Sequence, residues 1–150
     1  MSGYGKIEHL PGEKPVPLTD GLSEVYWQAA RERRLLIQRC TSCGAYQFYP
    51  RSHCRSCLAA EPEWVQASGR GRLHTFSVVY RSTNPEFADD CPYVFAIVEL
   101  DEGVRMSTRI VETPVKSLAC DAAVEVTWPH PQAEPPVPVF TLIATDEEAP

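Results

Sequence analysis

Four cysteines form two identical pairs, and they constrain this chain more than any other feature. Cys40 and Cys43 make one Cys-x-x-Cys pair, and Cys54 and Cys57 make the second after ten intervening residues. Thiolate sulfur is a soft ligand, and four thiolates in a closed tetrahedral shell are a usual structural site for zinc. Gly44, directly after the first pair, suits the tight bend that such a segment needs. The spacing therefore predicts a zinc ribbon whose metal is held by all four sulfurs.

Two other uses of these cysteines are open at this point. Disulfide bonds would require an oxidising compartment, and residues 1–22 contain no apolar core of signal-peptide length. Since no stretch approaches about 20 apolar residues, we expect a soluble cytoplasmic protein with no membrane contact, which favours metal over disulfides. His53, next to Cys54, is an alternative ligand in place of one thiol. A closed four-sulfur shell leaves no open position, so its zinc is expected to stabilise the fold and not to react.

From Gly69 onward the pattern is that of a small all-β domain. Runs rich in β-branched and aromatic residues predict strands, and Asp101-Glu102-Gly103 predicts a hairpin turn. The predicted strands cover 73–80, 93–100, 104–111, 124–128 and 139–144. Five or six short strands with one longer loop, 81–92, favour a small Greek-key barrel of the OB type over a sandwich. The segment Gly69-Arg70-Gly71-Arg72 is expected to be a turn.

The N-terminal part is expected to hold one helix and two short strands around the cysteines. Thr19 or Asp20 is the expected N-cap, and strands are predicted near 35–37 and 46–49. Four apolar residues at helical spacing predict one buried helix face: Leu22, Val25, Tyr26 and Ala29. The fold class is therefore mainly β. Its predicted parts are an extended arm (1–20), a helix plus zinc ribbon (21–66), an OB-fold barrel (67–144) and an acidic tail (145–150).

The sequence contains no recognisable catalytic motif. It has no nucleophile elbow, phosphate-binding loop or dinucleotide fingerprint. The four histidines form no evident cluster with carboxylates. Cys91 and Cys120 lack the basic surroundings that activate a thiol, and neither is given a role. We therefore expect no catalytic residue in this chain.

Several short segments carry a further signal through their order along residues 20–144. They are Tyr26-Trp27, Leu35 to Gly44 (LLIQRCTSCG), Tyr49-Pro50-Arg51, Cys54-Arg55-Ser56-Cys57, Gly69-Arg70-Gly71, Pro92-Tyr93 and Val137-Pro138-Val139-Phe140. Together they resemble the zinc-ribbon/OB-fold family of acyl-CoA-associated proteins. One departure is Asp121, where the family often has a glycine before the Val-x-Val strand, so the turn there is expected to differ.

What the resemblance implies is a non-catalytic accessory subunit. Members of the family look like companions of thiolase-fold enzymes (thiolases, synthases and side-chain aldolases), and some are paired with a hotdog-fold enoyl-CoA hydratase. The partner would supply the reacting residues, and this chain would stabilise it and help to hold CoA or acyl-CoA. A CoA site needs arginines and an aromatic platform, for which the candidates are Arg70, Arg72, Tyr80, Arg81 and Phe87. A solvated turn and ordinary strand packing are the other interpretation of these five residues.

Charge is distributed unevenly along the chain and limits the possible partners. The net charge is −6; residues 1–75 carry ten Lys and Arg against seven Asp and Glu (+3), and residues 76–150 carry four against thirteen (−9). Nucleic-acid-binding domains usually present a basic surface to the phosphates, so the acidic half argues against that function. A nucleic-acid-binding zinc-ribbon/OB module is nevertheless the alternative hypothesis, because OB barrels occur in that role.

Overall fold

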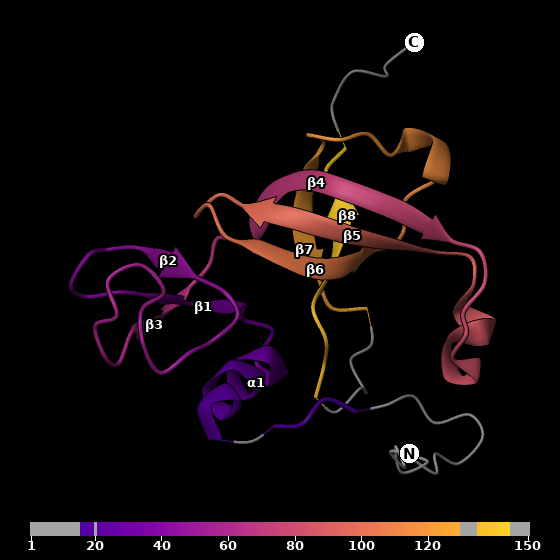
Figure 1. The fold of residues 1–150 in the computed structure, drawn as a ribbon. Helices are drawn as coiled ribbons and strands as arrows, with labels where there is room; N and C mark the ends of the chain where they lie inside the picture. Colours follow the sequence, from indigo (N-terminus) through magenta and orange to yellow (C-terminus); the bar gives the residue numbers. More distant parts are fainter. Residues whose placement is uncertain (1–15, 20, 130–134, 145–150) are drawn as a thin grey trace, which may run out of the picture.

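The computed structural model describes residues 16–19, 21–129 and 135–144. One short helix, a three-stranded sheet and a closed five-stranded barrel follow one another along the chain (Figure 1). This is the mainly β, OB-like architecture that the sequence predicts. The predicted tail, and the predicted arm apart from 16–19, lie outside the described residues. No helix within the described ranges is long and apolar enough to span a membrane.

The N-terminal helix begins later than predicted. A 3₁₀ turn, η1 (Gly21–Ser23), leads into α1 (Glu24–Arg31), and Ser23 occupies the N-cap position. The predicted cap at Thr19 or Asp20 is therefore wrong; Asp20 itself lies outside the described residues. The error comes from the intervening 3₁₀ turn, which moves the start of the α-helix toward the C-terminus.

The buried face of α1 also differs from the predicted one. Tyr26, Ala29 and Ala30 are buried, whereas Leu22 and Val25 are 45% and 43% exposed. Leu22 lies in the 3₁₀ turn, which has three residues per turn, so it does not align with the α-helical face. The helix therefore packs through one aromatic ring and two small alanines, and two of the four predicted core residues remain at the surface.

The cysteines are carried by an antiparallel sheet with the order β2-β1-β3. Its strands are β1 (Leu36–Arg39), β2 (Tyr46–Gln47) and β3 (Glu63–Gln66). β1 is central and buried apart from Arg39, and it leads directly into Cys40. β3 was not predicted from the sequence, because a four-residue strand with only two apolar residues gives a weak pattern.

Five strands close into the barrel in the spatial order β4-β5-β6-β8-β7. Neighbours are antiparallel except β6 and β8, which run parallel and pair at Ile110 and Phe140. Each predicted barrel strand is present; the strand predicted at 93–100 has the predicted ends, and the other four have shifted ends. Alternate residues of β5 are buried, as expected for a small barrel filled by its inward side chains. The strands are β4 (Arg70–Val79), β5 (Tyr93–Leu100), β6 (Arg105–Ile110), β7 (Ala123–Thr127) and β8 (Val139–Leu142).

β4 begins inside the segment that was predicted to be a turn. Gly69 has φ +75, the left-handed conformation that glycine tolerates. Arg70, Gly71 and Arg72 instead pair with β7. A Cβ on Gly71 would lie 2.1 Å from the carbonyl oxygen of Glu99, so glycine is needed here for close approach of two strands. The turn prediction is right for Gly69 and wrong for the three residues after it.

A 3₁₀ helix, η3 (Val115–Ser117), and a turn at Asp121 connect β6 to β7. Asp121 has φ +67, and its N–H donates to the carbonyl of Leu73 at 2.8 Å. Aspartate is one of the few residues other than glycine that adopt this conformation. The aspartate at this position is therefore compatible with a left-handed turn.

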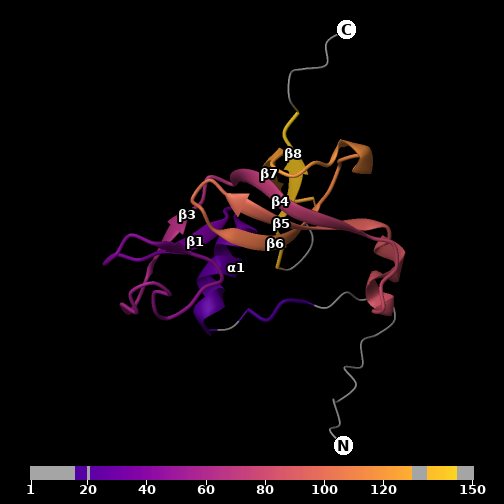
Figure 2. The same ribbon diagram turned by 45° about the horizontal axis from the view of Figure 1, so that its top comes forward.

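The long loop between β4 and β5 contains an unpredicted 3₁₀ helix, η2 (Pro85–Asp90). Arg109 on β6 holds it against the barrel. The guanidinium lies 2.8 Å from the Asp90 carboxylate, 3.9 Å from the ring centroid of Tyr93 and 5.3 Å from that of Phe87. In both views η2 lies at the end of the barrel away from the three-stranded sheet (Figures 1 and 2).

One apolar core runs from the helix through the sheet into the barrel. The ring centroids of Tyr26 and Phe48 are 5.7 Å apart, and both residues belong to the same buried cluster as Leu73, Val98 and Phe140 of the barrel. Because these parts share a core, a change at the cysteines is expected to reach the barrel through packing.

Candidate metal centre and the adjoining groove

The four sulfurs predicted to bind zinc converge on one point. All four Sγ atoms lie within 4.8 Å of one another. The Sγ atoms of Cys40 and Cys57 are 3.6 Å apart, as are those of Cys43 and Cys54. With Zn–S bonds of ~2.3 Å, the edges of a tetrahedron of sulfurs measure about 3.8 Å. The arrangement therefore fits a four-sulfur zinc site held by the residues that the sequence predicts.

Each cysteine pair is held in the same kind of tight loop. In the first loop the N–H of Gly44 donates to the carbonyl of Cys40 at 2.9 Å, and in the second the N–H of Leu58 donates to the carbonyl of Cys54 at 3.1 Å. Gly44 and Leu58 both have left-handed backbones, with φ of +76 and +64. The two loops thus have matching backbones, although only one has a glycine at this position.

Backbone N–H groups favour the thiolate form of two cysteines. The N–H of Cys43 lies 3.4 Å from Sγ of Cys40, and the N–H of Ser56 lies 3.3 Å from Sγ of Cys54. Hydrogen bonds from the backbones of Cys57 and Ser56 lower the pKa of Cys54 to about 6, and the hydrogen bond from Cys43 lowers the pKa of Cys40. Because thiolate is the form that binds metal, each loop presents one sulfur suited to it.

A buried amide pair fixes the second loop. Gln38 and Gln47 are 1% and 4% exposed, and Nε2 of Gln47 donates to Oε1 of Gln38 at 2.8 Å. The same Oε1 accepts the N–H of Arg51 at 2.8 Å, and Oε1 of Gln47 accepts the N–H of Arg55 at 2.9 Å. Two side chains therefore anchor the segment that carries Cys54. This pair was not predicted from the sequence, although a glutamine within a buried apolar strand needs a polar partner.

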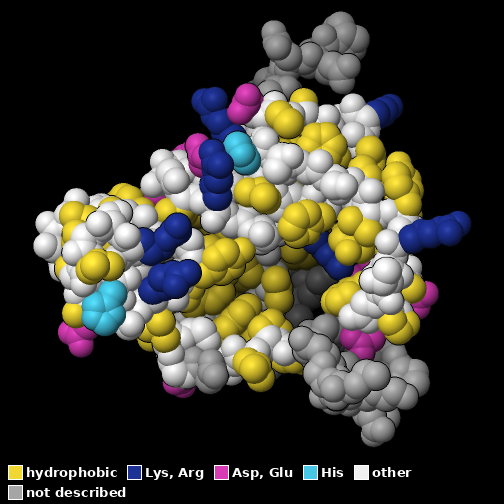
Figure 3. Space-filling model, viewed as in Figure 1, with side chains coloured by type: hydrophobic (Ala, Val, Ile, Leu, Met, Phe, Trp, Pro, Cys, Tyr) yellow, Lys and Arg dark blue, Asp and Glu magenta, His cyan; other side chains and the backbone are white. Residues whose placement is uncertain are grey.

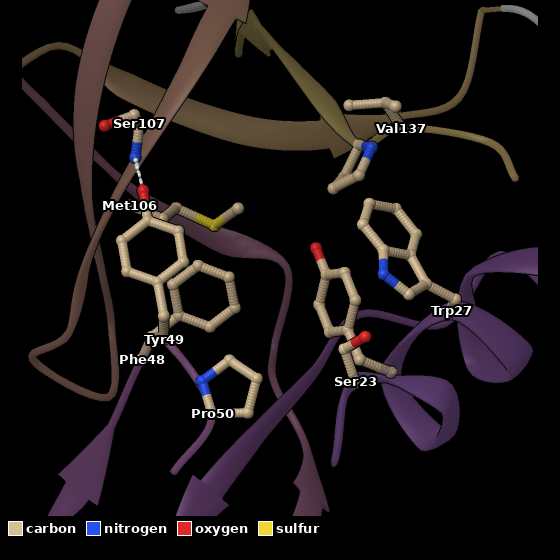
Figure 4. A pocket seen from close by; sticks show the side chains of 10 residues that line it. Ser23, Trp27, Phe48, Tyr49, Pro50, Met106, Ser107 and Val137 are labelled. Carbon is tan, nitrogen blue, oxygen red and sulfur yellow. Dashed lines mark hydrogen bonds between the residues drawn. The ribbon is translucent and has the colours of Figure 1, made fainter. Parts of the chain in front are cut away.

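A groove of about 250 Å³ lies where α1, the sheet and the barrel meet. Hydrophobic side chains gather between the ribbon and the barrel in Figure 3, and Figure 4 shows the groove from close by. Tyr49 joins the two parts, because its hydroxyl accepts a hydrogen bond from the N–H of Ser107 at 3.2 Å. On another wall, burial raises the pKa of Tyr26. The residues that line the groove come from distant parts of the sequence, so no local pattern indicates it.

The five residues predicted to contact CoA do not form one cluster. Arg70 and Arg72 lie at the start of β4, Tyr80 and Arg81 follow its end, and Phe87 lies in η2. Eight residues of strand at ~3.3 Å each separate Arg72 from Tyr80 by about 26 Å. The structure therefore divides them into two groups at opposite ends of β4.

Among the described residues, the four cysteines are the only potential metal ligands that converge in a group of three or more. Ser52 Oγ and His53 Nδ1 lie 3.0 Å apart, on exposed side chains. Sγ of Cys91 lies 3.5 Å from the carbonyl oxygen of Phe87, and Cys120 is exposed. None of the six cysteines takes part in a disulfide bond. The chemistry of the described part is thus that of a closed metal site.

Family models match two consecutive parts of the chain. The rubredoxin-like zinc ribbon domain of ChsH2 matches residues 27–63, and the C-terminal OB-fold domain of ChsH2 matches residues 64–129. The border between the matches falls within β3. Together they account for the metal-binding sheet and for most of the barrel.

Curated relatives share the same region. A probable enoyl-CoA hydratase alpha subunit from Thermomonospora curvata is 31% identical over 136 residues, which is 91% of this chain but only 42% of that relative. A DUF35 domain-containing scaffold protein from Methanocaldococcus jannaschii is 36% identical over 104 residues, covering 68% of this chain and 73% of the relative. The benzoylsuccinyl-CoA thiolase subunit BbsA from Geobacter metallireducens is 35% identical over 89 residues, covering 59% and 58%.

A solved structure agrees with these relatives. One chain of the Ltp2-ChsH2(DUF35) aldolase has a TM-score of 0.75 and 31% sequence identity to this chain, and the match covers 84% of this chain and 98% of that one. Both the fold and the order of the two domains are shared. The chain therefore belongs to the DUF35 family, with the zinc-ribbon and OB-fold domains of ChsH2.

Proposed function

We propose that this chain is a non-catalytic accessory subunit of a thiolase-fold enzyme acting on acyl-CoA thioesters. The observation that carries the proposal is the match to a chain of the Ltp2-ChsH2(DUF35) aldolase, at 31% identity and over 98% of that chain. The similarity to BbsA, which is named as a subunit of a thiolase for a CoA thioester, supports the same class of partner. The four-sulfur site adds support, since a closed zinc shell stabilises a fold and leaves no position for substrate.

The surface of the chain suits a role in assembly. Two large apolar side chains of the ribbon are exposed: Leu58, in the second cysteine loop, by 75%, and Tyr49 by 53%. Exposed large apolar side chains are candidates for protein contacts. We propose that the ribbon contacts the enzyme subunit.

We also propose that this chain contacts CoA directly, and two places on its surface are candidates for that contact. Arg72 pairs in register with Glu99, and Glu99 with Arg105, whose Nε lies 2.7 Å from the same carboxylate. Arg105 makes the ion pair with Glu99, so the charge of Arg72, on the other side of that carboxylate, remains available for a phosphate. At the other end of β4, Tyr80 and Arg81 are exposed and offer a ring and a cation. We propose that one of these ends meets the nucleotide of a CoA held by the partner.

A hotdog-fold enoyl-CoA hydratase is the second candidate partner. The relative from Thermomonospora curvata, named as a hydratase alpha subunit, favours it with 31% identity over 91% of this chain. Both candidates act on acyl-CoA, so the reaction of the assembled enzyme separates them: carbon–carbon bond cleavage or formation for the first, and hydration of a double bond for the second.

Co-expression tests the proposal. The full chain is produced with a thiolase-fold subunit and, separately, with a hotdog-fold hydratase subunit from the same organism. A stable complex on size exclusion is expected with one of them, with acyl-CoA turnover that neither chain shows alone. Cys43→Ser should lose the complex by unfolding the ribbon, and Cys120→Ser should retain it. An enzyme subunit that is fully active without this chain would contradict the proposal.

The two CoA places are separated by kinetics on that complex. Arg72→Ala and Arg81→Ala each remove one cation from opposite ends of β4. The variant at the true contact should raise KM for acyl-CoA while kcat stays unchanged, since it removes binding to a part of the substrate that does not react. If both variants have the same KM for acyl-CoA as the parent complex, CoA contact is excluded at both ends.

A further inference from the structure

Part of one edge of β6, beside the groove, has no strand partner among the residues that the structure describes. β5 pairs along the whole of β6, whereas β8, within the described ranges, pairs with it only at Ile110. The N–H of Ser107 points away from β5, because it donates to the hydroxyl of Tyr49. Alternate residues of an antiparallel ladder direct their backbone groups to the same side. Arg105 therefore presents its N–H and C=O along this edge too, and both Arg105 and Ser107 are exposed.

Within the described part of the chain, one side chain and no strand contacts this stretch of the edge. The hydroxyl of Tyr49 satisfies a single donor, the N–H of Ser107. The carbonyls of Arg105 and Ser107 receive no hydrogen bond from the described residues. A strand edge with free donors and acceptors is a template for another extended chain. The backbone of β6 is thus ready to accept one more strand.

The groove next to this edge supplies apolar contacts. In Figure 4, Phe48, Tyr49 and Met106 lie on one side of the groove, and Trp27 and Val137 lie on the other. The ring of Tyr26 contacts both Trp27 and Phe48. The volume is about 250 Å³. A helix laid in the groove would leave the outward backbone groups of β6 without partners, because its own N–H and C=O groups pair within the helix. An extended segment can pair with those groups and place one large side chain in the groove.

The charges at the edge restrict the ligand further. Arg105 is paired with Glu99 at 2.7 Å, and Arg109 with Asp90 at 2.8 Å. With both cations already neutralised, nothing here selects a charged segment. A fatty acyl chain would fill the apolar groove but would leave the carbonyls and the N–H of β6 without partners. An extended, uncharged polypeptide meets both requirements.

We propose that β6 and the groove receive an extended apolar segment of the partner enzyme subunit, which adds to β6 as a strand and places one large apolar side chain in the groove. Main-chain hydrogen bonds supply affinity in this mode of recognition, and the pocket supplies specificity. Bound in this way, the segment contacts the helix, the ribbon and the barrel at once. That the segment comes from an enzyme subunit rests on the proposed function.

A peptide experiment tests the site without any enzyme. The zinc-loaded full chain is used to select from a displayed library of peptides of about eight residues, long enough for one strand. Enrichment of sequences rich in β-branched residues with one aromatic or leucine anchor is expected. Exchange of backbone amides is then followed by NMR with a selected peptide. The amide of Arg105 should become protected, and that of Met106, already paired with β5, should not change.

Two variants at one position separate pairing from simple apolar contact. Ser107→Pro removes the outward N–H and obstructs a new strand, so the peptide should bind about tenfold more weakly. Ser107→Ala keeps the N–H and should bind as the parent does. The proposal is overturned if no peptide is enriched, if bound peptide leaves Arg105 unprotected, or if both variants bind equally. If Ser107→Pro fails to fold, protection at Arg105 in the parent chain decides. A negative result in the peptide experiment does not change the outcome of the co-expression experiment, so the strand-addition proposal and the proposed function are tested separately.

Discussion

Leu58 stands in the second cysteine loop at the position that Gly44 holds in the first. Each donates its N–H to the carbonyl of the first cysteine of its loop, and each has a left-handed backbone. This conformation costs an ordinary L-residue about 1–2 kcal/mol. Leu58 is 75% exposed, so burial of its own side chain does not offset that cost. The exposed leucine is consistent with contact to a partner, because strain of this kind is found at functional sites.

Substitutions at the two positions should have opposite effects on stability. Leu58→Gly should raise the free energy of unfolding of the isolated chain by up to about 1 kcal/mol, since strain relief exceeds the entropy gained by the unfolded chain. Gly44→Ala should lower it by about 1 kcal/mol through the backbone alone, because a Cβ there meets no atom within 4 Å. Urea unfolding at fixed zinc concentration measures both. A loss of stability in Leu58→Gly would mean that the leucine side chain makes a stabilising contact within the chain.

Substitution of Gln38 should destabilise the second cysteine loop, because it removes hydrogen bonds that fix this segment. Gln38→Ala removes the acceptor for the side-chain amide of Gln47 and for the N–H of Arg51. A buried donor left without a partner costs about 1–3 kcal/mol, so stability should fall by at least that much, and zinc should pass faster to a colorimetric chelator. Gln66→Ala, at an exposed position of β3, is the matched control and should change stability by less than about 0.5 kcal/mol. Equal zinc-transfer rates in the two variants would show that the amide pair does not hold the loop.

The metal should stabilise the ribbon and, through the shared core, the barrel. Reconstitution with cobalt should give one metal per chain and the absorption of tetrahedral thiolate coordination, because all four sulfurs fit the shell. Chelation should then increase amide exchange at Ile37 and Phe48 first, and also at Leu73, which belongs to the same core. Cys120→Ser, outside the site, should bind metal as the parent does. Unchanged exchange at Leu73 after metal removal would show that ribbon and barrel are energetically independent.

How well a feature could be predicted from the sequence depends on how far apart in the chain its interacting residues lie. The metal site depends on two local loops of fixed spacing, so Cys40, Cys43, Cys54 and Cys57 could be identified directly. β5 could be predicted because its apolar residues are continuous.

Other features depend on contacts between distant residues. The amide pair and the Tyr49–Ser107 bond join separate strands, and the groove needs three parts of the chain to meet. The turn assigned to Arg70, Gly71 and Arg72 failed for the same reason, since Gly71 is required by the backbone of β5, a distant segment.

Arg109 should control the order of η2 more than the stability of the whole chain. Its guanidinium lies over Tyr93 and near Phe87, and it pairs with Asp90, with side chains only 30% and 19% exposed. Arg109→Ala should lower stability by about 1–2 kcal/mol, the sum of a cation–π contact and a partly shielded ion pair. Amides of η2 should exchange faster by a larger factor, because the rest of the barrel retains its strand pairing. Hydrogen exchange followed by NMR measures both effects.

Two controls separate charge from stacking at this position. Arg109→Lys keeps the charge but loses the planar group that stacks on aromatic rings, so η2 should exchange at an intermediate rate. Arg105→Ala removes an ion pair whose side chains are 55% and 43% exposed, and it should cost less than about 1 kcal/mol. If Arg109→Ala and Arg105→Ala have the same effect on η2, neither the ion pair nor the stacking of Arg109 holds that segment. If Arg109→Lys exchanges as slowly as the parent, stacking contributes nothing there. If η2 is released only in the Arg109 variants, any CoA contact by Arg81 or Phe87 depends on Arg109 as well, because that residue holds the loop in place.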